Sequence, residues 1–467
     1  MGILAGYSEA DITPGLGVAL DGYASRDRGA DEIADPLLVQ GLYLSDGSLE
    51  AVVISADVCS LPGQTLNEIR QAVSGTTGVR PAAVVVCPSH THFAPAVEAK
   101  LWMRKEATSC LDAGFGARLV EQAAAAARQA KQRASAARLR AGKAQAPGIS
   151  FNRRPLAPDG RCTNRLRLPP EQAGAASFVG WQLRQLWDAG GYGGPRYSKP
   201  HAHVEGLRLG VTDPDVTVLA VETADGRPMV AVVNFACHPV CGGPNFYAVS
   251  ADYVCYMRRT VRAALMQVSP SSPAEPGLPA VMFVLGAAGD QVPAWREDDA
   301  RARVGQGLGG AALLAWNCAQ PVGEETLRIG TAEAELPLRE FPAPAELRER
   351  YESADATQRA FLGFQLSMAE RIGGRKAAPL QVTALRVGSW GLVNGAGEIL
   401  TEIGLHIKQR SPVPLTMFAS LSVEGYGYMP TDEAMREGGY EAEWSGLAFG
   451  AAAAQIETAL TALCRTL

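Results

Sequence analysis

Short apolar runs rich in β-branched residues alternate with longer amphipathic stretches along most of the chain. The run Ala83-Val84-Val85-Val86 predicts a buried strand, and Asp46-Gly47 between two apolar runs predicts a hairpin turn. A strand at 51–55, a helix near 64–73 and the strand that leads to residue 90 form a βαβ unit. The pattern therefore predicts an α/β fold, with a mixed β-sheet core flanked by helices.

The same periodicities predict the other elements. Strands are expected over residues 6–12, 38–44, 216–222, 229–235, 281–285, 381–387, 392–393 and 417–423. Helices are expected over residues 117–141, 294–318, 343–372, 398–409 and 451–465, and after Asp252 as an N-cap. Residues 143–205 are rich in Gly, Pro, Trp and Arg and predict an irregular, lid-like insert. We expect a single domain over residues 1–467.

The composition is that of a globular protein with few classes of partner. The net charge is -5 and 19% of the residues are charged, so no basic surplus attracts nucleic acid. No apolar run approaches the roughly 20 residues that cross a bilayer, and the first residues lack a secretory pattern. We expect a cytoplasmic protein without stable membrane association. Nine scattered cysteines indicate reduced thiols, and the sequence leaves the oligomeric state open.

The segment Ser89-His90-Thr91-His92 stands where a buried strand meets a proline-bounded turn. Open α/β sheets place their chemistry at this carboxyl edge. The chain has six histidines, so two within three positions indicate a metal or catalytic role, with local turn hydrogen bonding as the alternative. Other strand ends carry similar residues: His238, Asp290, Glu398 and Tyr428. Two neutral imidazoles, one carboxylate and an open position make a catalytic zinc arrangement, which lowers the pKa of bound water toward about 7.

Other features compete with this interpretation. His201-Ala202-His203 is a second His-x-His motif, but it lies in the polar insert, where a solvated or substrate-facing histidine is the alternative. Cys237 and Cys241 flank His238 but lack a second ligand pair for a structural zinc site. The sequence contains no Gly-x-Ser-x-Gly elbow and no P-loop, which argues against an α/β-hydrolase with a serine nucleophile and against a P-loop nucleotide-binding protein.

Two aspartates at element ends have alternative roles. Asp57 ends the strand at 51–55, and Asp252 opens a predicted helix. Either carboxylate could orient an imidazole from behind a metal site. We favour the simpler interpretation, in which both residues serve turn and cap geometry.

Several motifs in order along the chain resemble the neutral/alkaline non-lysosomal ceramidase family, which are zinc-dependent amidases. The motifs are Ser89-His90-Thr91-His92 with Pro95, Asn234-Phe235-Ala236-Cys237-His238-Pro239, Ser250-Ala251-Asp252-Tyr253, Gly397-Glu398, and Gly427-Tyr428 with Tyr440-Glu441. The resemblance runs from Ala10-Asp11-Ile12-Thr13 to about Trp444. It implies the catalytic-domain fold of neutral ceramidases and four ligands for Zn²⁺: His90, His238, Glu398 and Tyr428.

The resemblance also implies roles around the metal. His92 corresponds to the active-site histidine that handles protons and steadies the oxyanion. Arg153 corresponds to the substrate-side arginine, with the adjacent Arg154 as its rival, and Tyr440 corresponds to the second active-site tyrosine. Amide hydrolysis needs donors near the developing oxyanion and a proton for the leaving amine, which these residue types supply.

Two departures from the family pattern shape the expected substrate. The chain has Gly289-Asp290-Gln291-Val292-Pro293 where the family usually has Gly-Asp-Val-Ser-Pro, so apolar Val292 replaces a serine hydroxyl at the substrate. The sequence also shows neither the export signal nor the C-terminal immunoglobulin-like domain of lipid-processing members. We therefore expect hydrolysis of an amide in a soluble N-acylated small molecule. The alternatives are ester or lactone hydrolysis, amide formation at the same zinc, or a non-catalytic binding protein.

Overall fold

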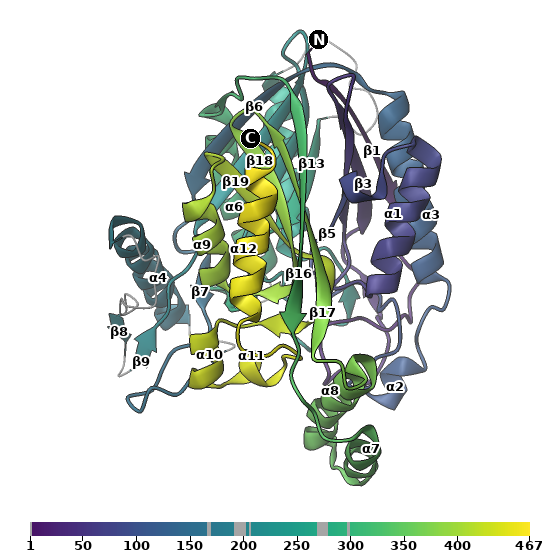
Figure 1. Cartoon of the computed structure of the whole chain (residues 1–467), viewed down its shortest axis with the longest axis vertical. Coiled ribbons are helices and arrows are strands. Elements are labelled where there is room, and N and C mark those ends of the chain that lie inside the picture. Colours follow the sequence, from purple (N-terminus) through teal and green to yellow (C-terminus); the bar gives the residue numbers. More distant parts are fainter. Residues whose placement is uncertain (1, 166–169, 191–201, 205–206, 269–278, 297–298) are drawn as a thin grey trace.

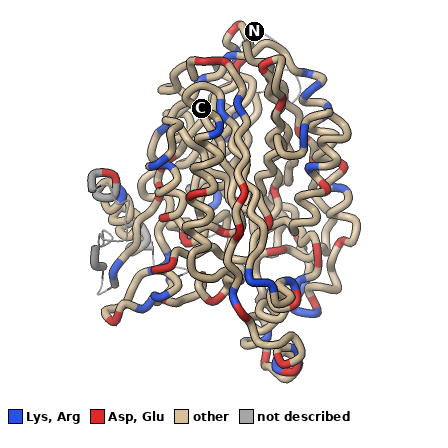
Figure 2. The backbone as a smooth tube through the Cα atoms, viewed as in Figure 1, with Lys and Arg blue, Asp and Glu red and all other residues tan. Residues whose placement is uncertain are grey.

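The computed structural model describes residues 2–165, 170–190, 202–204, 207–268, 279–296 and 299–467 (Figure 1). Two main sheets lie at the centre, and helices cover their outer sides (Figure 1). None of the described helices is long and apolar enough to cross a membrane. All nine cysteines are free thiols, as the sequence predicts. Lys and Arg residues are interspersed with Asp and Glu residues along the described chain (Figure 2).

The larger sheet has nine strands: β1 (Leu4–Asp11), β3 (Leu38–Ser45), β4 (Glu50–Ala56), β5 (Val84–Pro88), β6 (Ser135–Gln145), β10 (Asp215–Thr223), β11 (Pro228–Phe235), β13 (Ala280–Leu285) and β15 (Gln320–Pro321). Their order is β13-β11-β10-β6-β1-β3-β4-β5, and β15 pairs with β6. The pairs β4–β5 and β11–β13 are parallel and the other pairs are antiparallel. The expected mixed sheet, the hairpin at Asp46-Gly47 and the parallel strand pair of the βαβ unit are thereby confirmed.

The smaller sheet consists of β16 (Leu327–Pro337), β17 (Ala377–Val387), β18 (Trp390–Ile399) and β19 (Leu415–Met429), in that order. Its strands β18 and β19 are parallel. The buried Asn234 connects the two sheets, because its amide donates to the carbonyls of Val284 on β13 and Phe418 on β19 at 2.9 and 3.0 Å. Strand β19 also packs against β5 and β13. The ends of β5, β11, β18 and β19 are thus held in one compact region.

Six helices pack on the strands of the two sheets: α1 (Gly63–Thr77), α3 (Phe115–Gln132), α5 (Tyr253–Val268), α6 (Ala300–Asn317), α9 (Thr401–Arg410) and α12 (Ala451–Cys464). Further helices are α2 (Lys105–Thr108), α4 (Pro170–Gly190), α7 (Pro344–Ser353), α8 (Ala356–Ile372), α10 (Asp432–Glu437), α11 (Tyr440–Glu443) and the 3₁₀ turn η1 (Pro81–Ala83). Three short strand pairs complete the described chain: β2 (Glu32–Ile33) with β12 (Ala248–Val249), β7 (Ser150–Asn152) with β14 (Gln291–Pro293), and β8 (Ala202–Val204) with β9 (Leu207–Leu209).

Strand β5 is apolar throughout because both of its faces are covered. Val84, Val85 and Val86 are each at most 2% exposed, and the strand contacts α1 as well as β13 and β19. Burial of a valine side chain contributes about 1.5–3 kcal/mol. The turn that follows β5 therefore starts from a strongly anchored strand.

Helix α3 lies close against the larger sheet because small residues face it. A Cβ added to Gly6 of β1 would lie 2.0 Å from the carbonyl oxygen of Ala130. The buried face of α3 is largely alanine, at Ala123, Ala127 and Ala130 among others. Small side chains on both elements permit this close approach, which longer side chains would prevent.

Several expected boundaries are wrong. The expected helix over 117–141 ends at Gln132, and the following Ala- and Arg-rich residues form β6. The expected helix over 64–73 continues to Thr77, where Gly78 ends it with φ 78°. The expected helix over 343–372 is two helices, α7 and α8, and β16 was not expected.

Two further corrections affect the candidate site. The expected helix over 398–409 begins at Thr401, so Glu398 lies on β18. The segment 143–205 is not irregular throughout, since it includes the 21-residue helix α4. Long-range pairing of β18 with β19 and packing of α4 on the rest of the chain decide these elements, and neither interaction is visible in local sequence.

Candidate metal centre

His90 is held at the end of β5 in an unusual backbone conformation. Its φ is 67°, in the left-handed region that costs a non-glycine residue about 1–2 kcal/mol. Its backbone N–H donates to Val58 O at 2.9 Å, and its Nδ1 lies 2.7 Å from Cys59 O. Because a carbonyl oxygen can only accept, Nδ1 carries the hydrogen. The segment after β4 therefore fixes the His90 ring and leaves Nε2 as the nitrogen that faces Glu398.

His238 is fixed in the same way after β11. Its Nδ1 lies 2.7 Å from Ala288 O and 3.1 Å from Gln291 O, so Nδ1 donates here too. Backbone carbonyls of the segment after β13 thus orient this ring. A metal-binding histidine commonly has its second ring nitrogen held by such an acceptor, which sets the tautomer and the ring direction.

Glu398 brings the two imidazoles to a common point. Its Oε2 lies 3.2 Å from His90 Nε2 and 3.1 Å from His238 Nε2. One ligand atom from each of the three residues lies within 4.8 Å of the others. Two imidazole nitrogens and a carboxylate oxygen are zinc ligands. The structure therefore brings together three residues, expected from the sequence, that could hold a metal ion.

The charges at this cluster are strongly coupled. Burial opposes ionisation of Glu398, but His90 and His238 hold the pKa of this carboxyl well below its usual range. Burial and the charge of Arg153 lower the pKa of His238 to about 4. Burial also acts to lower the pKa of His90, but Cys59 and Glu398 outweigh it and raise that pKa well above its ordinary value. Without a metal, a proton on His90 compensates the buried carboxylate.

Tyr428 stands directly opposite Glu398 in the parallel pair β18–β19. Gly397 has φ 71°, and a Cβ there would lie 2.6 Å from Gly427 O, so glycine allows this close strand contact. Burial, together with Glu398, raises the pKa of the phenol well above its usual value. The structure thus places the expected phenol beside the expected carboxylate.

Arg153 lies between the tyrosines and a buried acid. Its Nε donates to Glu441 Oε1 at 2.7 Å and its Nη2 donates to Gly289 O at 2.8 Å. Its Cζ is 5.5 Å from the ring centres of both Tyr428 and Tyr440. These two rings lie 5.5 Å apart, edge to face. Arg153 and Tyr440 therefore both lie near the metal-binding cluster.

Arg154, the alternative to Arg153 as the substrate-side arginine, is engaged by protein groups. It donates to Glu441 Oε2 at 2.6 Å and to the carbonyls of Ala434 and Gly438 at 3.1 and 2.9 Å. The Glu441 carboxylate also accepts from Asn164 at 2.8 Å. This network holds both guanidinium groups in place.

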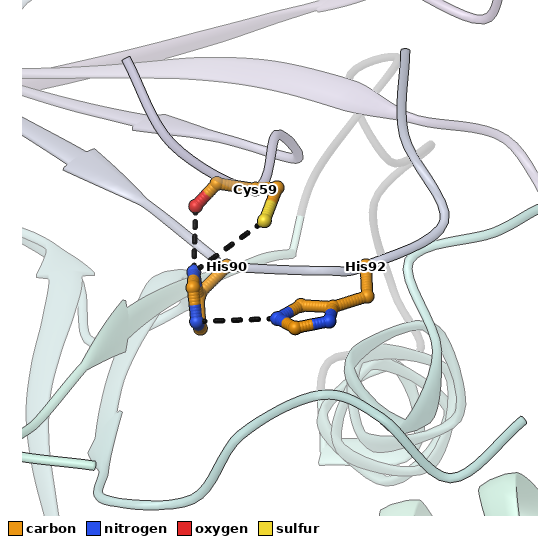
Figure 3. Close-up of side chains that lie close together, drawn as sticks. All are labelled: Cys59, His90 and His92. Atoms are coloured by element: carbon orange, nitrogen blue, oxygen red, sulfur yellow. Dashed lines mark hydrogen bonds between the residues drawn. The ribbon is translucent and has the colours of Figure 1, made fainter. Parts of the chain in front are cut away.

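His92 lies beside His90 (Figure 3). The two Nε2 atoms are 3.3 Å apart, and His92 Nδ1 is buried without a hydrogen-bond partner among the described residues. Burial and the neighbouring charges of His90 and His238 lower the pKa of His92 well below its ordinary value. The imidazole is therefore neutral at neutral pH.

Cys59, His90 and His92 form a second group that could hold a metal ion. Figure 3 shows that Cys59 approaches the Nδ1 edge of His90, whereas His92 approaches the Nε2 edge. His90 Nδ1 is already engaged by Cys59 O at 2.7 Å. In the group of His90, His238 and Glu398, both Nε2 atoms approach one carboxylate oxygen, at 3.2 and 3.1 Å, so this group is the better metal site.

The two candidate aspartates are engaged elsewhere. Asp57 pairs with Arg258 at 2.5 and 3.1 Å, and Asp252 accepts the backbone N–H groups of Cys241 and Gly242 at 3.1 and 3.2 Å. Asp57 thus forms a long-range ion pair and Asp252 holds the backbone of residues 241–242, so their roles extend beyond the turn and cap geometry favoured from the sequence. His201 and the side chain of His203 lie outside the described residues.

Val292 is fully buried in an apolar cluster with Phe151, Ala176, Leu209 and Val240. Val292 pairs with Phe151 of β7, which stands two residues before Arg153 in the chain. The residue that replaces the expected serine hydroxyl thus belongs to a buried apolar cluster.

Comparison with solved structures finds close likeness in fold. Neutral ceramidase from Pseudomonas aeruginosa matches with a TM-score of 0.69 and 16% identity, over 100% of this chain and 75% of that chain. A ceramidase complexed with C2 matches with a TM-score of 0.70 and 15% identity, over 98% and 75%. The chain has the neutral ceramidase fold. No family model and no curated protein sequence matches the chain.

The likeness to neutral ceramidase confirms the fold class that the short motifs indicate. It extends over the whole chain, so the ceramidase fold includes every element that supplies the cluster. At 15–16% identity the likeness establishes the fold. What the residues do is argued below from their geometry.

The sequence did not reveal how the imidazoles are oriented. The acceptors are the backbone carbonyls of Cys59, Ala288 and Gln291, and a carbonyl carries no side-chain pattern. Gly22 and Tyr23, which contact His92, were also missed. A glycine followed by an aromatic residue in an N-terminal turn was the available signal.

Proposed function

We propose that the protein is a zinc-dependent amidohydrolase that cleaves an amide bond in a soluble, N-acylated small molecule. The observation that carries this proposal is the convergence of His90 Nε2 and His238 Nε2 on one carboxylate oxygen of Glu398, at 3.2 and 3.1 Å. The neutral ceramidase fold supports the reaction class.

The donor set fits zinc. Two imidazoles with their Nδ1 hydrogens engaged by carbonyls present neutral nitrogen ligands, and Glu398 supplies an anionic oxygen. We assign Tyr428, which stands opposite Glu398, as the fourth zinc ligand. When bound, zinc supplies an activated water and polarises a carbonyl group.

The residues around the metal site stabilise the developing negative charge and transfer the proton. Arg153 and Tyr440 donate hydrogen bonds to the substrate oxygen on which negative charge develops, because both lie beside Tyr428. His92 is neutral, so it accepts a proton and then delivers it to the leaving amine. Glu441 positions Arg153 by accepting from its Nε at 2.7 Å.

We further propose that residues 143–205 cover the site and that the chain acts as one cytoplasmic domain over 1–467. Ala176 of α4 packs with Phe151 and Val292 next to Arg153, which supports a covering role for this segment. The apolar cluster around Val292 suits an apolar part of a small substrate.

Matched amide and ester substrates test the function. We expect amide hydrolysis that a chelator abolishes and stoichiometric zinc restores, with the ester or lactone cleaved less efficiently. Preferred cleavage of the ester, or net amide formation, would replace the proposed reaction while keeping the metal. Zinc-free protein that folds stably and hydrolyses nothing would contradict the proposal and leave a binding protein on this fold.

A further inference from the structure

Tyr23 belongs to a turn that is built against His92. Gly22 has φ +93°, and a Cβ at this position would lie 2.3 Å from His92 Cγ. Only glycine permits this backbone to reach the imidazole. The next residue, Tyr23, packs its ring edge to face on His92, with ring centres 4.9 Å apart and an interplanar angle of 71°.

Arg26 locks the turn to the histidine. Its Nη1 donates to Asp21 O at 2.7 Å and to His92 O at 2.6 Å. The guanidinium carbon also lies 4.8 Å from the centre of the Tyr23 ring. The position of Tyr23 relative to His92 is therefore set by a buried cation and by backbone contact, and not by loose packing.

The Tyr23 hydroxyl is a buried polar atom with no hydrogen-bond partner among the described residues, and the same holds for His92 Nδ1. A buried hydroxyl without a partner costs about 1–3 kcal/mol, and most such groups are satisfied. His92 Nδ1 faces the backbone of Gly22, whereas the Tyr23 hydroxyl is left for a partner that enters the site. A substrate with a polar group beside the scissile amide supplies that partner.

The charged groups around the Tyr23 phenol indicate which chemical group of a substrate would bind it. Burial raises the pKa of Tyr23 to about 12, while Arg296 and Arg26 act to lower it and Asp252 and Cys241 act to raise it. The hydroxyl is thus protonated at neutral pH and acts as a donor. Two guanidinium groups near the phenol favour an anionic acceptor, because a desolvated carboxylate needs compensating positive charge.

We propose that Tyr23 is a substrate-binding residue whose hydroxyl donates to a carboxylate oxygen of the substrate, which makes the substrate an N-acyl amino acid. This inference rests on the proposed amidase function and narrows it to one substrate class. The Tyr23 hydroxyl discriminates between an N-acyl amino acid and the same amide without its carboxylate.

The experiment compares N-acylglycines of increasing acyl length with the matching N-acyl methylamines, which lack only the carboxylate. Wild type is expected to prefer the N-acylglycines. Tyr23→Phe keeps the ring against His92 and is expected to lower kcat/KM for N-acylglycines by about tenfold to a hundredfold, as for a lost hydrogen bond to a charged group. Its kcat/KM for N-acyl methylamines and its zinc content stay unchanged.

Tyr43→Phe is the matched control, because the Tyr43 hydroxyl contacts Glu50 on β4, away from the cluster. This variant is expected to match wild type on both substrate series. If Tyr23→Phe lowers kcat/KM equally for N-acylglycines and N-acyl methylamines, Tyr23 serves to position His92. If kcat/KM is unchanged for both, the Tyr23 hydroxyl does not contact the substrate. Either result overturns the inference.

Zinc content separates the two proposals. A zinc-bound wild type that hydrolyses other amides but shows no preference for N-acylglycines overturns this inference alone. A zinc-free protein without amidase activity overturns the proposed function. In that case calorimetric titration with N-acylglycine still tests the role of Tyr23. Tighter binding by wild type than by Tyr23→Phe supports the contact with the carboxylate. Equal binding, or none, overturns it.

Discussion

Glu398 and Tyr428 are direct partners across the parallel strands β18 and β19, although 30 positions separate them in the sequence. This pairing places a carboxylate and a phenol beside the imidazoles at the ends of β5 and β11. Glu398, with its lowered pKa, supplies the negative charge of the site, and Tyr428, with its raised pKa, supplies a neutral hydroxyl beside it.

Tyr428→Phe tests the phenol as a ligand. The substitution keeps the ring between Arg153 and Tyr440 but removes the oxygen. We expect zinc affinity to fall by about tenfold to a hundredfold, on the scale of contacts that support a metal, as measured by competition with a chromogenic chelator. Tyr426→Phe, two residues away on the same strand, serves as the control and is expected to keep wild-type affinity. Unchanged affinity in Tyr428→Phe would assign the phenol to substrate binding only.

Substitution of the two neighbouring histidines separates metal binding from proton transfer. We expect His90→Ala to lose zinc and turnover together, because it removes a ligand nitrogen 3.2 Å from Glu398 Oε2. His92→Ala is expected to keep zinc and lose turnover by about 10²–10⁴-fold, the usual contribution of a general acid–base group. Elemental analysis and single-turnover rates measure the two effects. Zinc loss in His92→Ala, with zinc kept in His90→Ala, would reverse the assignment.

Gly22→Ala probes the packing of the turn on His92. The new Cβ would meet the imidazole at 2.3 Å on a backbone with φ +93°, so the ring has to move. We expect zinc to be retained and turnover to fall more than tenfold. Gly15→Ala is the matched control, because nothing lies within 4 Å of its added Cβ. Normal turnover in Gly22→Ala would show that the position of His92 is unimportant.

The pH dependence of metal binding follows from the coupled charges. At neutral pH the raised pKa of His90 keeps a proton that zinc must displace, whereas His238 with a pKa of about 4 and Glu398 with a lowered pKa are already deprotonated. Zinc affinity therefore rises as pH increases toward the pKa of His90 and falls with acidification.

Calorimetric zinc titrations in buffers with different ionisation enthalpies measure the released protons. We expect release of on the order of one proton from His90 near pH 7. Affinity that is independent of pH between 6 and 8, with no proton release, would contradict this coupling.

Glu441 stabilises the site by neutralising two buried guanidinium groups. Its carboxylate accepts from Arg153 and Arg154 at 2.7 and 2.6 Å and is fully buried. Glu441→Gln removes the close counter-charge of both cations and leaves Arg154 with the longer ion pair to Glu437 at 3.5 Å. We expect a loss of about 3–5 kcal/mol in the free energy of unfolding. Glu443→Gln, at an exposed position of the same helix, is the control and is expected to change stability by less than about 0.5 kcal/mol. Equal unfolding midpoints for the two variants would contradict this view of Glu441.

Sequence patterns predicted the strands that lead to the site, because a strand that is buried on both faces is a continuous run of apolar residues. The valines of β5 and the apolar run of β11 were predicted close to their true positions. The histidines after them, and the acid and phenol of the smaller sheet, were therefore recognised as candidates. The structure brings all four into one region.

Other parts could not be predicted, since distant partners determine them. Residues 135–145 favour a helix by their alanine and arginine content, yet they form β6 by pairing with β10. A period of two, with Ala137, Leu139 and Ala141 buried and Arg138 between them exposed, was the available signal. The carbonyls that orient His90 and His238 depend on the backbone alone, and local sequence does not encode them.

Anomalous diffraction at the zinc absorption edge, from crystals of the zinc-loaded protein, tests the central claim most directly. We predict a single strong peak about 2.0–2.1 Å from the Nε2 atoms of His90 and His238 and about 2.0–2.2 Å from a carboxylate oxygen of Glu398. A peak elsewhere on the chain, or none between these three side chains, would contradict the account.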